Sequence, residues 1–288
     1  MKSLLLLRKI TKVFYKYRGL ARIAELIRKK YSSSHLKYII DDFDDNLKFI
    51  CYLNEHMSSQ IFWKGSYSTS QLRFLNKVLK SDMVFIDIGA NHGEFTLFVA
   101  KRVPKGKVIA FEPVSKLYKK LQENIAINNL QNIETYQIGI GSKKEKLKIY
   151  TQAEKFIDGS INDGLPTLHP DLKRNMFLEE IEVDTLDNVI GDKVDRVDMI
   201  KIDIEGNELF ALQGMTRILQ KYRPTLLIEI NKEMFENAGY KVMDVFSFLS
   251  SYSYTFYRIS DDGSINRLVN FNNIIFDNIV CKYEESWR

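Results

Sequence analysis

Residues 84–93, V-F-I-D-I-G-A-N-H-G, constrain the fold of this chain more than any other stretch. They open with branched apolar residues, which are typical of a strand buried on both faces of a parallel sheet. They then break at Gly89 and Gly93, before a segment with helical spacing at residues 94–100. A strand, a glycine turn and a helix in this order place the turn at the carboxyl edge of an open α/β sheet, where nucleotide-like ligands bind. Gly89 would allow a sharp turn, and Gly93 would let the helix start close to the strand or ligand.

Apolar runs that end in acids recur along the chain and alternate with segments of helical spacing. This alternation predicts a doubly wound, Rossmann-like α/β sheet whose strands are mostly parallel. Residues 133–140 are expected to form the third strand, and residues 207–222 one helix. The last two strands, 254–259 and 274–280, have no full helix between them, which favours a hairpin-like antiparallel edge.

The pattern of the glycine turn argues against a dinucleotide-binding site. It reads D-x-G-x-N-x-G, with Asn91 where the dinucleotide fingerprint has its second glycine. The carboxylate of Asp87 repels a pyrophosphate but suits a cation, and S-adenosylmethionine carries a sulfonium and an ammonium but no phosphate. Glu112, about twenty residues after the turn, could accept hydrogen bonds from ribose hydroxyls. We therefore predict an S-adenosylmethionine site formed by Asp87, Gly89, Ala90, Asn91, Gly93 and Glu112.

A second group of charged residues follows the strand predicted at residues 197–204. Lys201 interrupts this buried run and needs a partner there. Strand alternation would place Asp203 and Glu205 on the same face as Lys201, and Glu229 on the next strand is a candidate partner for the lysine. Each acid alone could cap a helix, but several acids at one sheet edge raise one another's pKa, which is typical of functional sites.

The net charge of +5 is spread unevenly. Residues 1–31 carry ten Lys or Arg and one acid, Glu25, and therefore +9, which leaves 5 − 9 = −4 for the remaining chain. The acidic body does not favour nucleic-acid binding. We predict a basic helical appendage over residues 1–65 and a main domain over 66–288, in which the irregular insertion 151–180 resembles a lid and contributes to acceptor recognition.

Apolar residues in the first thirty positions recur with helical spacing, which predicts one amphipathic helix or a pair. We favour helices packed on the domain with a solvated basic face, and contact with an anionic membrane surface stays open. No apolar run approaches the roughly eighteen residues of a spanning helix. Cys51 and Cys281 form no metal-binding pattern and are expected to be reduced, so we predict a cytoplasmic protein, membrane-associated if residues 1–31 bind lipid.

Several of these motifs together resemble the FkbM-type methyltransferases, which are S-adenosylmethionine-dependent enzymes. The resemblance covers roughly residues 80–235, and His92 departs from it because the family more often has an apolar residue there. It implies methylation of a hydroxyl on a sugar, a glycan or another natural product. The residues that carry it are 85–93, 110–113, 123–128, 201–206 with Glu208, and Arg223-Pro224 before the strand that contains Glu229.

Methyl transfer to a hydroxyl needs a group that takes up the hydroxyl proton. We predict that Asp203 is this base, with Glu205 as the second candidate and Lys201 orienting one of them. No ligand spacing requires a metal ion, although the same acids could bind one. Nitrogen or carbon acceptors, a nicotinamide-dependent oxidoreductase and a non-catalytic scaffold remain as alternatives, and the oligomeric state is not predicted.

Overall fold

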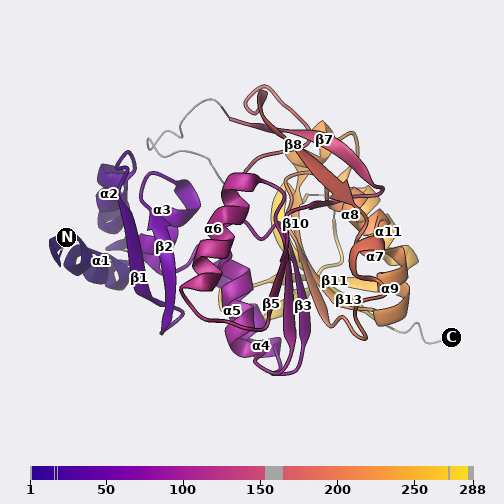
Figure 1. Ribbon diagram of the computed structural model, residues 1–288, viewed down its shortest axis with the longest axis horizontal. Coiled ribbons are helices and arrows are strands. Elements are labelled where there is room, and N and C mark those ends of the chain that lie inside the picture. Colours follow the sequence, from indigo (N-terminus) through magenta and orange to yellow (C-terminus); the bar gives the residue numbers. More distant parts are fainter. Residues whose placement is uncertain (1, 16, 18, 153–164, 272, 285–288) are drawn as a thin grey trace.

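The centre of the molecule is an eight-stranded sheet with helices on both faces (Figure 1). The computed structural model describes residues 2–15, 17, 19–152, 165–271 and 273–284, so residues 153–164 of the predicted insertion lie outside the described residues. The strand order is β12-β11-β13-β10-β9-β3-β4-β5. In chain order these strands are β3 (Val84–Ile88), β4 (Lys107–Phe111), β5 (Ile133–Tyr136), β9 (Met199–Ile202), β10 (Thr225–Asn231), β11 (Tyr254–Ile259), β12 (Ile265–Arg267) and β13 (Phe276–Tyr283).

The parallel part of the sheet consists of β5, β4, β3, β9 and β10, which confirms the predicted doubly wound arrangement. The predicted antiparallel C-terminal strand is also confirmed, because β13 runs antiparallel to β10. The predicted hairpin-like antiparallel edge is confirmed as well, because β11 and β13 pair antiparallel, with β12 outside them. β13 inserts between β10 and β11, because its buried residues Ile279, Val280 and Cys281 pack best in the interior of the sheet.

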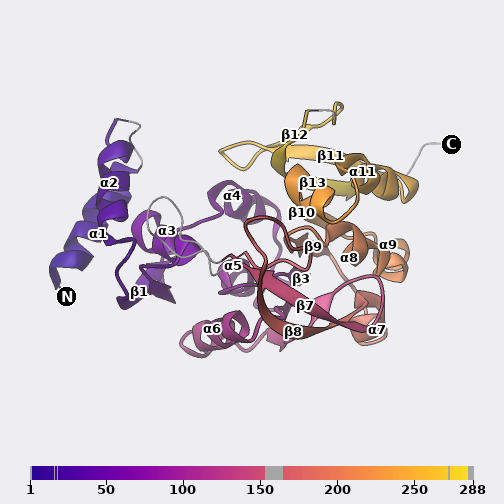
Figure 2. The same cartoon turned by 90° about the horizontal axis from the view of Figure 1, so that it is seen from above.

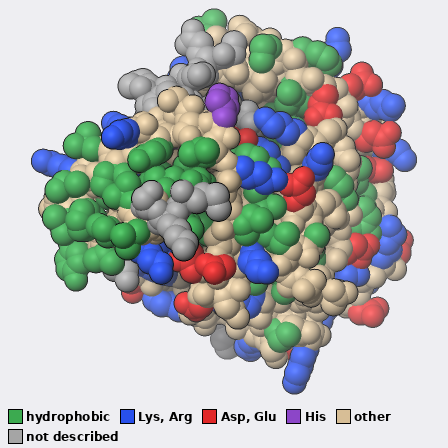
Figure 3. Space-filling model, turned by 60° about the vertical axis from the view of Figure 1, so that its left-hand side comes forward, with side chains coloured by type: hydrophobic (Ala, Val, Ile, Leu, Met, Phe, Trp, Pro, Cys, Tyr) green, Lys and Arg blue, Asp and Glu red, His purple; other side chains and the backbone are tan. Residues whose placement is uncertain are grey.

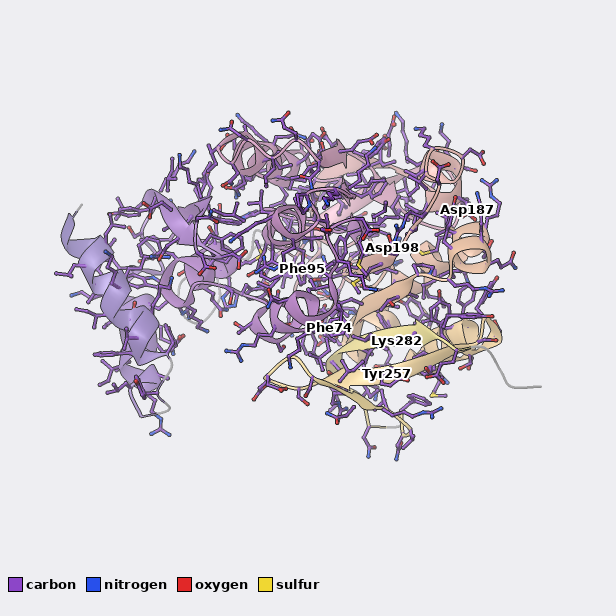
Figure 4. The ribbon with its side chains drawn as sticks, turned by 90° about the horizontal axis from the view of Figure 1, so that it is seen from below. Phe74, Phe95, Asp187, Asp198, Tyr257 and Lys282 are labelled. Carbon is purple, nitrogen blue, oxygen red and sulfur yellow. The ribbon has the colours of Figure 1, made fainter. Side chains whose placement is uncertain are left out.

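Alternating residues of the central strands serve two separate cores. Phe85 of β3 packs with α4 and α5, whereas Ile86 and Ile88 face α7, α8, α9 and α11. Figure 4 labels Phe74 and Phe95, which belong to the first of these cores, and Tyr257 and Lys282, which lie side by side on β11 and β13. The helices are α4 (Thr69–Val78), α5 (Glu94–Arg102), α6 (Ser115–Ala126), α7 (Leu186–Ile190), α8 (Glu208–Gln213), α9 (Thr216–Tyr222), α10 (Lys232–Asn237) and α11 (Val242–Ser251).

A second, three-stranded sheet stands above the carboxyl edge of the first (Figure 1). It contains β6 (Gly139–Ile140), β7 (Glu145–Thr151) and β8 (Met176–Asp184). The prediction of one strand over residues 133–140 is therefore wrong, because the chain leaves the main sheet after Tyr136 and pairs with β8 instead. The predicted helix 207–222 is also divided, at Gly214, where a Cβ would lie 1.9 Å from the carbonyl oxygen of Gly141.

The N-terminal residues form a module at one end of the molecule (Figures 1 and 2). Its elements are α1 (Lys2–Phe14), α2 (Ala21–Tyr31), β1 (Lys37–Phe43), β2 (Leu47–Tyr52) and α3 (His56–Lys64). The first two confirm the predicted helix pair, and the structure adds a strand pair. The core of the module, built around Phe49 and Trp63, includes Leu97 of α5 and so continues into the main domain. None of the described helices is both long and apolar enough to cross a membrane.

Buried polar contacts also join this module to α6. Lys120 lies 2.5 Å from Glu55, and both side chains are almost completely buried. Asn124 accepts a hydrogen bond from the backbone N–H of Ile50 on β2 and donates one to the carbonyl oxygen of His92 in the glycine turn. The module is therefore connected through α6 to the carboxyl edge of the main sheet.

We expect Glu55→Gln to lower the free energy of unfolding by about 3 kcal/mol, because removing one partner of a buried ion pair leaves the other charge uncompensated. Lys37→Gln is the matched control. It breaks an exposed pair with Glu123 between the same two parts of the molecule, so its cost should stay below about 1 kcal/mol. Urea denaturation measures both values, and equal costs would contradict this account of the interface.

Candidate functional site

The turn between β3 and α5 is shaped by glycine. Gly89 has a φ of 81°, and a Cβ there would lie 2.0 Å from the carbonyl oxygen of Asp203. Only glycine therefore allows the ends of β3 and β9 to come this close. The N–H groups of Gly89 and Ala90 both donate to the carbonyl oxygen of Phe111 at the end of β4. The turn is thus fixed against both neighbouring strands.

Lys201 lies beneath this turn as a buried cation in the middle of the sheet. Its Nζ donates to the carbonyl oxygen of Gly89 at 2.7 Å and lies 3.5 Å from carboxylate oxygens of Asp87 and Asp203. Burial alone would lower the pKa of Lys201, but attraction by Asp203, Asp87 and Glu229 outweighs it and raises that pKa. The lysine therefore stays charged and ties the ends of β3 and β9 together.

Asp87 is fully buried behind Lys201 and does not line the cavity described below. Its other carboxylate oxygen accepts a hydrogen bond from the Thr96 hydroxyl of α5 at 2.6 Å. Gly93, another of the predicted ligands, also lies outside the cavity lining. It packs against Leu121, and a Cβ there would lie 2.7 Å from that side chain. Both residues support the turn from behind.

Glu112 closes the other side of the turn, at the end of β4. Its carboxylate accepts hydrogen bonds from the N–H of Asn91 at 2.8 Å and of Val114 at 3.0 Å. Burial raises the pKa of Glu112 to about 7, although the two N–H donors oppose the shift. This carboxyl group is held rigidly by the backbone, and its protonation state changes near neutral pH.

Three carboxylates gather beyond the end of β9, from Asp203, Glu205 and Glu229, with an oxygen of each within 4.8 Å of the other two. The predicted strand alternation does not place them, because β9 ends at Ile202 and Glu205 adopts a left-handed conformation with a φ of 55°. Burial, and then repulsion by Asp203, raise the pKa of Glu205 to about 8 and that of Glu229 well above its ordinary value. Such a group could hold a divalent cation or a cationic ligand.

Arg174 compensates part of this negative charge. It is buried in the segment before β8, within 3.1 Å of Glu205 and 2.7 Å of Asp171. The sequence offered no sign of this arginine, because it lies in the irregular insertion far from any motif. His169 in the same segment is half-buried and stacks on Phe210 with ring centroids 5.8 Å apart.

One cavity of about 120 Å³ brings most of the predicted residues together at the carboxyl edge of the sheet. It is lined by Gly89, Ala90, Asn91 and Glu112 on one side and by Lys201, Asp203 and Glu205 on the other.

Part of the cavity wall comes from residues that no sequence motif singled out, although the insertion as a whole was expected to contribute to the site. They lie on three segments outside the motifs: His56 and Met57 of α3, Tyr67 and Ser68 before α4, and Leu165, Pro166 and Leu168 of the insertion. Glu94 fixes the second segment, because its buried carboxylate accepts hydrogen bonds from the N–H groups of Tyr67 and Ser68.

The sheet order and the position of the cavity define an α/β protein that binds its ligand beyond the carboxyl ends of the strands. The family model of the methyltransferase FkbM domain matches residues 87–256, which is more than half of the chain. The chain therefore belongs to the FkbM methyltransferase family, as its motifs suggested.

Several known proteins are similar to this chain. Methyltransferase 1 of Beauveria bassiana is 27% identical over 146 residues, which are 46% of this chain and 59% of that protein. Methyltransferase sdnD of Sordaria araneosa is 28% identical over 189 residues, which are 57% of this chain and 71% of that protein. The crystal structure of the methyltransferase FkbM from Methylobacillus flagellatus KT is 16% identical, with a TM-score of 0.49 over 90% of this chain and 58% of that one.

The buried carboxyl groups of the site predict an unusual dependence of stability on pH. The pKa values of Glu112 and Glu205, about 7 and about 8, are raised by burial above the ordinary value of 4.5. Protonation therefore stabilises the fold below pH 4.5, and this contribution is lost as the pH rises through 7 and 8. We expect Tm to fall by about 3 °C or more between about pH 6 and about pH 9.

Calorimetry of the protein without added ligand measures this dependence. Glu205→Gln should flatten the decrease in Tm, because the amide does not titrate. Glu182→Gln, which replaces an exposed carboxylate on β8, should leave it unchanged. A Tm that rises over this range in the unmodified protein would show that the acids are not held as described.

Proposed function

We propose that this protein transfers the methyl group of S-adenosylmethionine to a hydroxyl group of a small-molecule or glycan acceptor. The observation that carries the proposal is a single cavity with Glu112 on one side of the glycine turn and Asp203 with Glu205 on the other. β4 and β9 flank β3 in the sheet, so these acids are separated by the turn. One ligand can therefore reach a ribose-binding carboxylate at one end and a cation-binding cluster at the other.

The side of the cavity near Glu112 suits a nucleoside. Each oxygen of this carboxylate accepts one backbone hydrogen bond, and a carboxylate offers about four lone-pair sites, so sites remain for ribose hydroxyls. Phe111, Ile138 and Ile140 provide apolar walls close by. An adenine ring could pack between such side chains, because its faces are apolar.

The side of the cavity near Asp203 suits a cationic methyl donor. Glu205 and Glu229 resist ionisation while they are buried together, and a positive ligand beside them would lower their pKa values and bind more tightly as they ionise. A sulfonium fits this environment, whereas a phosphate would be repelled. The names of the two relatives support methyl transfer. The acceptor class is what the resemblance to the family implies.

When bound, S-adenosylmethionine supplies a methyl carbon whose bond to sulfur breaks, leaving the electron pair on sulfur, as its bond to the acceptor oxygen forms. Asp203 takes up the hydroxyl proton, because it lines the cavity and 34% of its side chain is accessible. Lys201 holds this carboxylate from behind at 3.5 Å. Glu205 is less available because Arg174 engages it. The protein also orients the acceptor oxygen in line with the methyl–sulfur bond.

We expect Asp203→Asn to reduce turnover about 100-fold or more, because it removes the proton acceptor, while the affinity for S-adenosylmethionine changes only a few-fold. A radiolabelled methyl-transfer assay against glycan and lipid fractions measures the first quantity, and calorimetry measures the second. Glu205→Gln is the comparison within the cluster and should retain more activity. A collapse of cofactor affinity in Asp203→Asn would instead make Asp203 a cofactor ligand.

The pH profile of kcat separates the two candidate bases. If Glu205 accepted the proton, kcat would rise as Glu205 ionises in the cofactor complex, with an apparent pKa below the value of about 8 that burial gives this group without a ligand. With Asp203 as the base, we expect no such step in the unmodified enzyme or in Glu205→Gln. Binding of a nicotinamide cofactor instead of S-adenosylmethionine would overturn the proposed reaction itself.

We expect methyl transfer to survive EDTA, because Lys201 and Arg174 already supply positive charge to the acidic cluster. The measurement is the same transfer assay with and without chelator, followed by the addition of Mg²⁺ in excess. Loss of activity with EDTA and its recovery with Mg²⁺ would show that Asp203, Glu205 and Glu229 share a catalytic ion, which would lower the pKa of the acceptor hydroxyl.

A further inference from the structure

The two N-terminal helices expose apolar side chains to solvent. On α1, Leu6, Ile10 and Val13 follow one another at helical spacing, and Leu6 is 63% exposed. On α2, Ile23 and Leu26 also have helical spacing and are exposed, Leu26 by 68%. We call these five residues together with Leu20 the outer apolar surface. Soluble proteins seldom leave so many large apolar side chains together in water, so this surface indicates a binding partner.

The same helices turn charged side chains inward. Arg8 of α1 is buried and lies 2.6 Å from Asp42 of β1. Arg28 of α2 is also buried and lies 2.6 Å from Glu25. The inner faces also carry apolar residues, because Leu4 is buried in the core of the N-terminal module, and Leu5, Leu7 and Ile27 pack against it. None of the six residues of the outer apolar surface belongs to that core, so the packing of the module does not account for them.

Basic side chains surround the outer apolar surface. Lys9, Arg22, Lys29 and Lys30 are exposed, and no acid pairs with them in the part of the chain that the structure describes. Glu25, the single acid in the first thirty-one residues, is engaged by Arg28 and by the Tyr15 hydroxyl. Figure 3 shows hydrophobic side chains gathered at this end of the molecule, with Lys and Arg side chains at their margin.

We propose that α1 and α2 dock on an anionic lipid bilayer. The outer apolar surface enters the boundary between headgroups and acyl chains, and the basic margin contacts lipid phosphates. A second copy of the chain fits less well, because a symmetric contact would bring the basic margins of both copies together. The α1–α2 pair lies at the far end of the molecule from β11 and β12 (Figure 2), so docking leaves the main sheet free of the bilayer.

Co-sedimentation of the full chain with phosphatidylcholine vesicles, with and without about 30% phosphatidylglycerol, tests this proposal. We expect binding to the anionic vesicles in about 0.1 M salt and much weaker binding in about 0.5 M salt, because salt screens the lysine and arginine charges. Replacing Lys9, Arg22, Lys29 and Lys30 by Gln should weaken partitioning on the order of 100-fold.

The apolar part of the surface is tested with Ile10→Ser combined with Leu26→Ser, which should weaken binding about 10-fold or more. The matched control is Val269→Ser combined with Ile275→Ser. It replaces two exposed apolar residues outside this surface and should leave binding unchanged. Circular dichroism and Tm show whether the variants keep the fold. The readout requires no methyl transfer, so its outcome is independent of the proposed reaction.

Three results would overturn the proposal. The first is failure of the unmodified protein to sediment with anionic vesicles in about 0.1 M salt. The second is equal binding by the apolar variant and its control. The third is a dimer in light scattering that Ile10→Ser with Leu26→Ser dissociates, because the surface would then be an interface between two copies of the chain.

Discussion

The buried charge of Lys201 is the interaction on which the arrangement of the site depends. A lysine in a central strand is costly to bury without partners. Here Asp87 on the neighbouring strand, Asp203 beyond the strand end and the carbonyl oxygen of Gly89 compensate it. Asp87 and Gly89 belong to the end of β3, whereas Lys201 and Asp203 belong to β9 and its end, so these contacts form when β3 and β9 pair in this register. The lysine thus makes strand pairing and the shape of the cavity depend on each other.

The same contact explains why glycine and acids occur together at this edge. The close approach of Asp203 and Ile204 leaves no space for a side chain at Gly89, and the absence of a side chain there opens the cavity to a ligand. Two acids of the cavity are held near their point of ionisation. Burial raises the pKa of Glu112 to about 7 and that of Glu205 to about 8. A cationic ligand would therefore change their protonation as it binds.

The sequence predicted the parallel strands and their acidic ends because these signals are local: an apolar run, then glycine or carboxylate. It did not predict contacts between segments that lie far apart along the chain. Residues 139–140 leave the main sheet because β8 offers them a partner, and β13 enters the sheet between β10 and β11. Glu205 does not follow the strand alternation, because its backbone is left-handed. Arg174 contacts the acidic cluster from an irregular segment. Hydrophobic periodicity in the sequence does not predict contacts of this kind.

The N-terminal module forms part of the wall of the cavity as well as the basic end of the molecule. His56 and Met57 of α3 line the cavity, α1 and α2 pack on α3, and Glu55 at the start of α3 contacts Lys120 and His92 beside the glycine turn. His92 is buried there, and burial, then repulsion by Lys120, lower its pKa well below the ordinary value. A neutral imidazole can lie next to this lysine without opposing its pairing with Glu55. The departure of His92 from the family pattern therefore fits a chain whose N-terminal module packs directly against the turn.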